Sequence, residues 1–169
     1  MNIGVENGLN GVVDLVLMKA LYFDGDSGEN IRVEEIPDNL KDFCIEKKLE
    51  LIGTLAEIDE EMEEFYMEED YNVPVDVMKA CIRKHTIALN FCPVFLGSAF
   101  KNKGVQPLLD GVVDYLPNPK EVSNFAYDPK KGEDDDKVPM EINNKKPFVG
   151  LAFKLEETQY GQLTWIRIY

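Results

Sequence analysis

Residues 92–119, with the sequence CPVFLGSAFKNKGVQPLLDGVVDYLPNP, place the strongest constraint on how this chain folds. An apolar run over residues 93–96 ends at Gly97, and a polar turn follows as far as Gly104. In the next segment the apolar residues recur every three or four positions, the spacing of one helical face. These residues are Val105, Leu108, Leu109, Val112, Val113 and Leu116. The pattern predicts a buried strand, a turn and a packed helix that ends at Pro117, as in a doubly wound α/β sheet.

Gly97, Ser98 and Ala99 follow the predicted strand directly. In an α/β sheet, ligands bind at the carboxyl ends of the strands, so these three residues lie where a ligand is expected. Gly97 allows close backbone approach, and the N–H groups of Ser98 and Ala99 are placed to donate to a carbonyl on a flat ring. From spacing alone a plain turn is the commoner meaning of Gly-Ser after a strand.

The charge of −14 is distributed unevenly along the 169 residues. Residues 1–90 contain 21 acidic and 8 basic residues, whereas residues 91–169 contain 11 and 10. An acidic surface repels phosphate backbones, so residues 1–90 are not expected to bind nucleic acid directly, and a basic protein is the better partner. A hydrophobic content of 44% and the absence of any apolar run near 18 residues predict a soluble globular chain with no membrane partner. No targeting segment is visible at the N-terminus.

The three cysteines, Cys44, Cys81 and Cys92, have no zinc-type spacing and are predicted to be reduced, buried residues. The single histidine, His85, has no partner at helical spacing and is predicted to be a surface or helix-face residue rather than a ligand. Asp24 and Asp26 with Gly28 lack the remaining residues of a calcium loop. No metal site is expected.

The first 36 residues predict strands. Residues 12–17 are rich in β-branched and apolar residues, and residues 20–23 continue this run to a turn at residues 24–28. Alternation over residues 31–36 then predicts a returning strand and an antiparallel hairpin.

A helical region is predicted from Pro37 onward, and a second helix is predicted from about residue 75 to residue 89. In the first, one buried stripe comprises Leu51, Leu55, Ile58, Met62 and Phe65. The opposite side carries Glu57, Glu61, Glu64 and Glu68, and Asp59, Glu60, Glu63 and Glu69 flank them. This acidic side has two interpretations, a solvated helix face or a docking surface for a basic partner.

Residues 120–146 are polar, with several prolines and glycines, and predict a linker or surface loop. Residues 151–155 alternate in polarity and residues 163–169 follow a Tyr160-Gly161 turn, so a second hairpin is predicted.

Residues 97–106, GSAFKNKGVQ, resemble the last guanine-recognition motif of the GTPase domain in the elongation factor G family. Leu108-Leu109-Asp110 and Tyr115-Leu116-Pro117 resemble its closing helix. Similar residues continue on both sides, at 11–15 (GVVDL), 147–148 (PF), 152–154 (AFK) and 161–164 (GQLT). The resemblance covers nearly the whole chain, and residues 147–169 are more similar to the mitochondrial branch of the family than to the bacterial one.

The resemblance implies a partial α/β fold, similar to a P-loop GTPase sheet, that carries an α+β insert. Residues 1–90 would be the acidic insert subdomain, and residues 91–119 the last strand, guanine-motif turn and closing helix of the GTPase domain. Residues 120–146 would be a linker, and residues 147–169 the first strands of a β-barrel. The expected function is that of a fragment of a GTPase that drives translocation of tRNA and mRNA on the ribosome. The expected location is the mitochondrial matrix, with the cytoplasm or another organelle as the alternative.

The resemblance also implies the site residues. Gly97, Ser98 and Ala99 would bind guanine, and Glu57, Glu60, Glu61 and Glu64 would dock a ribosomal stalk protein. The parent protein would use GTP or GDP with Mg²⁺. No catalytic residue and no bound nucleotide are expected in the fragment, because it has no phosphate-binding loop and no Asn-Lys-x-Asp motif. The alternatives are the paralogue that recycles mitochondrial ribosomes and a free-standing acidic interaction module.

Overall fold

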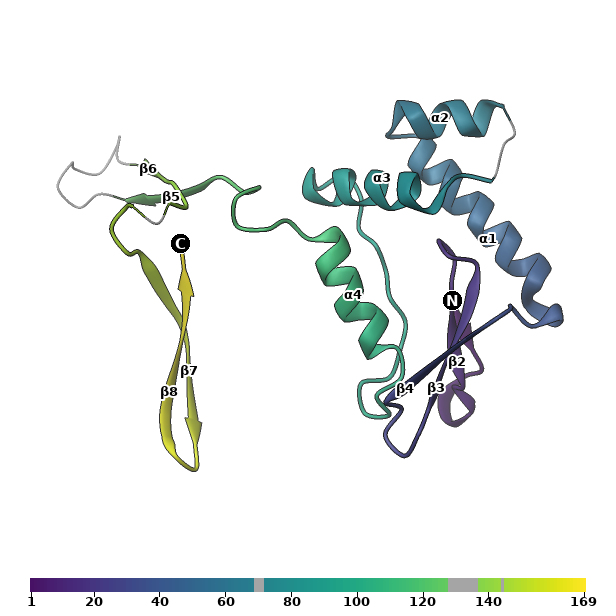
Figure 1. The fold of residues 1–169 in the computed structure, drawn as a ribbon, viewed down its shortest axis with the longest axis horizontal. Helices are drawn as coiled ribbons and strands as arrows, with labels where there is room; N and C mark the ends of the chain where they lie inside the picture. The colour runs from purple at the N-terminus through teal and green to yellow at the C-terminus, as the bar shows by residue number, and fades with distance from the viewer. Residues whose placement is uncertain (69–71, 128–136, 144) are drawn as a thin grey trace. The chain divides into compact units, whose positions relative to one another are not determined.

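An antiparallel sheet of four strands, in the order β1-β2-β3-β4, forms the beginning of the chain (Figure 1). Its strands are β1 (Asn2–Ile3), β2 (Gly11–Asp14), β3 (Lys19–Asp24) and β4 (Asn30–Glu34), and a short 3-10 helix, η1 (Glu6–Gly8), lies between β1 and β2. The computed structural model describes residues 1–68, 72–127, 137–143 and 145–169. They divide into two units, Met1–Leu116 and Pro117–Tyr169. The predicted hairpin is confirmed, with Ala20 opposite Glu34 and Asp24 opposite Asn30.

Residues 12–17 are not one strand continuing into residues 20–23, as the β-branched run predicted. The Asp14 carboxylate accepts hydrogen bonds from the N–H groups of Val16 (2.8 Å) and Leu17 (3.0 Å). Such a side-chain bond to the backbone two or three residues on stabilises a turn. The chain therefore reverses between β2 and β3, and these two strands form a hairpin of their own.

Four helices follow in the described part of the first unit. They are α1 (Asp38–Ala56), α2 (Glu60–Met67), α3 (Val75–Ile87) and α4 (Val105–Tyr115). The predicted stripe from Leu51 to Phe65 is buried or half-buried, but it spans two helices because the chain leaves helical geometry at Asp59 (φ −140°, ψ 123°). Ile52, Leu55, Met62 and Met78 are fully buried in the main core, where α1, α2 and α3 meet.

The predicted strand at residues 93–96 is not formed, which corrects the α/β half-unit expected for this region. These residues pair with no strand among the described residues, and the side chains of Val94 and Leu96 are 82% and 47% exposed. They border an apolar cavity of about 330 Å³ that also involves Val13, Ile82 and Tyr115. An extended segment becomes a strand only when a neighbour satisfies its backbone, and the described chain supplies none.

Helix α4 is also less packed than its apolar spacing predicted. Only Gly111 and Tyr115 of this helix are buried, and a Cβ at Gly111 would lie 2.2 Å from the Phe95 ring. Leu109 and Val113 are 59% and 78% exposed. The helical period was predicted correctly, but the described chain covers only a narrow strip of the helix.

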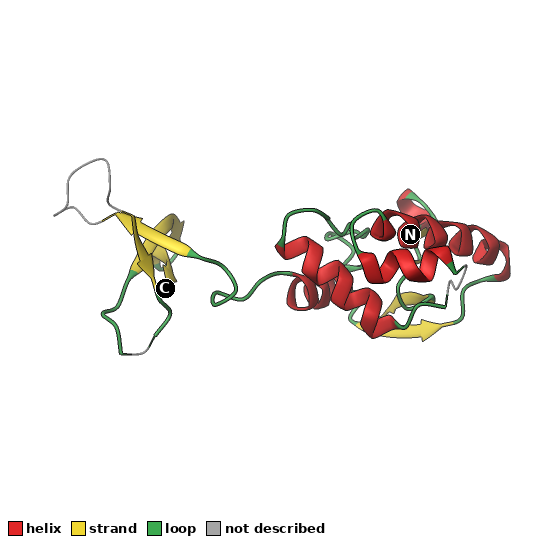
Figure 2. Cartoon of the chain, turned by 90° about the horizontal axis from the view of Figure 1, so that it is seen from above, coloured by secondary structure: helices red, strands yellow, loops and turns green. Residues whose placement is uncertain are grey.

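The second unit contains strands and no helix among its described residues (Figure 2). Its strands are β5 (Asn124–Tyr127), β6 (Lys137–Met140), β7 (Gly150–Thr158) and β8 (Gly161–Ile168). The hairpin predicted near the C-terminus is confirmed as β7 and β8, which pair from Gly150–Ile168 to Thr158–Gly161. The prediction of a linker over residues 120–146 is wrong for β5 and β6, which form an antiparallel pair. Part of the predicted linker, residues 128–136 and 144, lies outside the described residues.

The three cysteines do not share one environment. Cys44 and Cys81 are buried as predicted, and burial raises the pKa of both thiols, that of Cys81 to about 11. Cys92 is exposed, which corrects its prediction, because the segment it begins is not covered. Among the described residues, no helix has the length and apolarity needed to cross a membrane.

Candidate functional site

The predicted guanine-binding residues belong to a closed turn at the N-terminus of α4. The N–H of Ser98 donates to the Lys103 carbonyl (2.7 Å), and the N–H of Lys103 donates back to the Ser98 carbonyl (3.0 Å). At the tip, the N–H of Asn102 donates to the Ala99 carbonyl (3.1 Å). We call residues 97–104 the guanine turn, after the motif they resemble.

Two glycines allow the limbs of the guanine turn to approach each other. A Cβ at Gly97 would lie 2.5 Å from the Lys103 carbonyl oxygen, and one at Gly104 would lie 2.6 Å from the Leu96 carbonyl oxygen. Gly104 also has φ +82°, a conformation that residues with a Cβ rarely adopt. The sequence therefore specifies the shape of this turn at both of its ends.

The two amides expected to contact a base are in different situations. The Ser98 N–H is already used inside the guanine turn. Ala99 is exposed, and its N–H has no acceptor among the described residues. Of the predicted pair, the Ala99 amide is thus the donor that remains available to a ligand.

Of the four glutamates predicted to dock a partner, one follows the end of α1 and three lie on α2. Glu57, Glu60, Glu61 and Glu64 are all exposed, and we call them the acidic surface. Residues 57–70 contain nine acidic residues and no lysine or arginine. The side chains face solvent, while Met62 on the opposite side of α2 is fully buried. The geometry therefore presents a concentrated negative charge that a cationic partner can reach.

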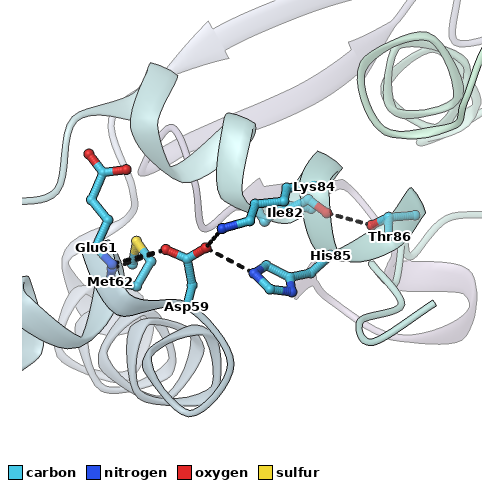
Figure 3. A network of polar contacts seen from close by, with 7 residues as sticks. All are labelled: Asp59, Glu61, Met62, Ile82, Lys84, His85 and Thr86. Atoms are coloured by element: carbon cyan, nitrogen blue, oxygen red, sulfur yellow. Dashed lines mark hydrogen bonds and ion pairs between the residues drawn. The ribbon is translucent and has the colours of Figure 1, made fainter. Parts of the chain in front are cut away.

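Asp59 holds this helix in place, and its role was not predicted from the sequence. Its carboxylate accepts from the N–H groups of Glu61 (3.2 Å) and Met62 (3.4 Å), which caps α2. Its other oxygen accepts from Lys84 Nζ (2.7 Å) and contacts His85 Nε2 (2.9 Å), both on α3 (Figure 3). Burial alone would raise the pKa of Asp59, but the bonds from Lys84, His85 and the backbone lower it to about 2.

His85 is a helix-face residue, as predicted, but it is buried rather than at the surface, with 5% of its area exposed. A lone histidine in a helix gives no sequence signal of burial, because its partner Asp59 is 26 residues away. The signal for Asp59 itself was present: an aspartate followed by two glutamates is a common N-cap pattern. It was hidden within the surrounding run of acidic residues.

Asp59, Cys81 and His85 place one ligand-type atom each within 4.8 Å of one another. These are donor types that zinc binds. However, both Asp59 oxygens already accept hydrogen bonds from the α2 backbone and from α3 side chains. The contacts support a structural role for this cluster, which joins α2 to α3.

A second set of polar contacts joins α3 to α4. Lys79 Nζ lies 2.6 Å from the Asp114 carboxylate. Arg83 Nη1 donates to the carbonyls of Asp114 (2.9 Å) and Leu116 (3.0 Å) at the end of α4. A cation at the last carbonyls of a helix is favourable, so these bonds fix α4 against the helix that carries Lys84 and His85.

Comparison with known proteins supplies the context for these sites. No family model matches the chain. In an alignment of 169 residues that covers 99% of the chain, it is 51% identical to the Culex quinquefasciatus protein named Elongation factor G, mitochondrial. The chain matches one piece of mitochondrial elongation factor G. It spans 23% of that relative's length, and the resemblance predicted from the guanine turn and its flanking residues is confirmed.

A solved structure supports the fold independently. A protein from Thermus thermophilus matches 99% of the chain with a TM-score of 0.67 and 21% sequence identity, and the chain spans 22% of it. At this identity the likeness is evidence for the fold alone. The predicted mixed α/β fold class is confirmed by this neighbour and by the observed sheets and helices.

Proposed function

We propose that this chain is part of a longer translational GTPase of the elongation factor G type, one that moves tRNA and mRNA through the ribosome. The supporting observation is the 51% identity to the Culex protein, which extends over 99% of the chain. The same relative is named mitochondrial, and we place the proposed activity in the mitochondrion. GTP and GDP with Mg²⁺ are the proposed cofactors of the longer protein.

Within that protein, residues 1–90 form the insert subdomain and residues 91–119 complete the GTPase domain. The second unit, which contains the β5–β6 and β7–β8 pairs, forms the start of the following domain. Hydrolysis is not assigned to the chain itself, because its sequence contains no phosphate-binding loop. The exposed segment at residues 93–96 and the exposed face of α4 support this division, since both have the composition of buried elements.

The guanine turn contributes to recognition of the base. The Ala99 N–H is exposed at the turn and donates to the carbonyl oxygen on the guanine ring. Adenine has an amino group at the equivalent position, which is itself a donor, so this contact selects guanine over adenine. Gly97 and the Ser98 backbone keep the turn closed beneath that amide.

The acidic surface docks a basic segment of a ribosomal stalk protein. Its four exposed glutamates lie within eight positions of the chain, and Asp59 fixes the helix that carries three of them. Charges of this kind increase the rate of encounter with an oppositely charged partner more than the final affinity. Direct binding of nucleic acid to residues 1–90 is not part of the proposed function, because their net charge is strongly negative.

The GTPase assignment is tested with the full-length protein that carries this chain. We expect GTP hydrolysis that ribosomes stimulate, and no hydrolysis by the 169-residue chain alone. An absence of ribosome-stimulated hydrolysis in the full-length protein would contradict the proposal. Tight GDP binding by the isolated chain would contradict the proposed division of roles. Splitting of ribosomes instead of movement along mRNA would assign the protein to recycling.

The docking assignment is tested by reversing three charges of the acidic surface together, Glu57→Lys, Glu61→Lys and Glu64→Lys. At low salt, association of the full-length protein with isolated stalk protein is expected to slow by about tenfold or more. The matched control reverses Asp42, Glu46 and Glu50, which are exposed on α1 and change the net charge equally. Equal effects of the two variants would show that net charge, and not the acidic surface, attracts the partner.

A further inference from the structure

Two loops of the four-stranded sheet lie at the same end of it and both contact the guanine turn. Residues 4–10 connect β1 to β2, and residues 25–29 connect β3 to β4. Gly11 at the start of β2 pairs with Tyr22 near the end of β3, so the two loops emerge side by side. We call them the support loops.

The first support loop receives two lysines of the guanine turn. Lys103 Nζ donates to the Leu9 carbonyl (2.8 Å), and Lys101 Nζ approaches the Glu6 carbonyl (3.4 Å). These partners are 94 and 95 residues apart in sequence. The lysines on either side of Asn102 therefore both contact backbone carbonyls of the first support loop.

The second support loop lies close to the backbone at the tip of the guanine turn. Gly28 is buried and has φ +65°, and a Cβ at this position would lie 2.8 Å from the Asn102 carbonyl oxygen and 3.0 Å from that of Lys101. The Gln106 side-chain amide donates to the Gly28 carbonyl (3.0 Å). The tip of the guanine turn thus rests directly on a glycine that no larger residue can replace without displacement.

Displacement at this contact is transmitted to the residue that carries the base-reading amide. The Asn102 N–H donates to the Ala99 carbonyl (3.1 Å), so a shift of Asn102 moves that carbonyl, and the Ala99 N–H lies on the other side of the same Cα. Affinity is highest when the recognition group is held in its bound position before the ligand arrives, because less ordering remains to be done on binding.

We propose that the support loops hold the guanine turn in its base-binding conformation, and that Gly28 and Gln106 are positioning residues for guanine nucleotide. This inference rests on the proposed function, since it assumes that Ala99 reads the base. Docking at the acidic surface does not involve the sheet of residues 1–34. The inference gives this sheet a role of its own, because its loops would set the affinity for nucleotide from outside the binding pocket.

The test is dissociation of fluorescent GDP from the full-length protein carrying Gly28→Ala. We expect dissociation about tenfold faster than from the unsubstituted protein. Gly25→Ala is the matched control, because Gly25 is in the same loop and also has positive φ (+97°), while the atoms nearest to its Cβ would be those of the Glu29 carboxylate and not of the guanine turn. Both substitutions strain the backbone, and only the first displaces the guanine turn.

Gln106→Ala gives a second measurement that does not depend on backbone strain, with dissociation expected to be about threefold faster. Because the base contact is the same in the ground and transition states, KM for GTP should rise while kcat with ribosomes is unchanged. Equal GDP dissociation from the Gly28→Ala and Gly25→Ala proteins, or a Gln106→Ala protein with unchanged dissociation, would overturn the inference. If the unsubstituted full-length protein binds no GDP, the proposed function itself has failed.

Discussion

Helices α2 and α4 belong to the same unit and both have a regular apolar stripe, but only the stripe of α2 is well buried. On α2, Met62 is fully buried and the opposite side carries the acidic surface. On α4, Leu109 and Val113 are more than half exposed, and the buried contacts are limited to Gly111 and Tyr115. Helical spacing therefore predicts that a face is apolar, and a partner element must be present before it is buried.

This comparison predicts that replacing an apolar side chain with alanine costs far more on α2 than on α4. Met62→Ala should lower the free energy of unfolding by about 2–5 kcal/mol, because it leaves a cavity in the main core. Val113→Ala on α4 should change it by about 0.5 kcal/mol or less, since that side chain is already in solvent. Urea unfolding of the 169-residue chain measures both. Similar losses would show that α4 is covered in solution.

The link between α2 and α3 is tested by removing the Asp59 carboxylate. Asp59→Ala leaves buried His85 without its partner and α2 without its cap, so unfolding should require about 3 kcal/mol less free energy. The corresponding change at α4, Asp114→Ala, breaks a half-exposed pair with Lys79 and should cost about 1 kcal/mol or less. A small effect of Asp59→Ala in urea unfolding would mean that apolar packing alone holds α2.

The same carboxylate should make stability depend on pH at low pH. The pKa of Asp59 is lowered from 3.8 to about 2, so the folded state favours the charged form. The resulting stabilisation is complete above about pH 4 and is lost as the pH falls through about 2, a change of roughly 2 kcal/mol. Urea unfolding at about pH 5 and about pH 2.5 should show this loss in the unsubstituted chain. An Asp59→Asn chain with an identical pH profile would contradict the assignment.

A small stabilising effect is expected at the C-terminal end of α2, where the negative charge of Glu68 is unfavourable. No basic residue lies in the last turn of this helix, and Glu64 is four positions before Glu68. Glu68→Lys should stabilise the chain by about 0.3–1 kcal/mol through the helix dipole and relief of repulsion. Glu60→Lys, at the opposite end of α2, should destabilise it. The melting temperatures of the two variants should shift in opposite directions if local helix electrostatics act. Equal shifts would show that only the net charge matters.

Local patterns in the sequence predicted most of the elements. The β3–β4 and β7–β8 hairpins, the buried stripe of Leu55 and Met62, and the exposure of the four glutamates were all accessible from periodicity and turn residues. The guanine turn was found through its resemblance to a family motif, because a Gly-Ser pair after an apolar run is too common to assign a function.

What the sequence could not predict depends on contacts between distant residues. The Asp59–His85 contact spans 26 positions, and the Gln106 bond to Gly28 spans 78. No period or spacing carries such information. The predicted strand at residues 93–96 was wrong for a related reason: its composition fits a buried strand, but strand formation requires a neighbour that the described chain does not supply.

The exposure of Cys92, next to the extended segment, gives the chain a selective chemical handle. Cys44 and Cys81 are buried and their thiols have raised pKa values, so a thiol-reactive dye at neutral pH should attach mainly at Cys92. A dye there would sit one residue before Pro93, beside the exposed residues 94–96, which pair with no strand in the part of the chain that the structure describes. Its emission would then report directly when another segment of polypeptide comes to cover that surface.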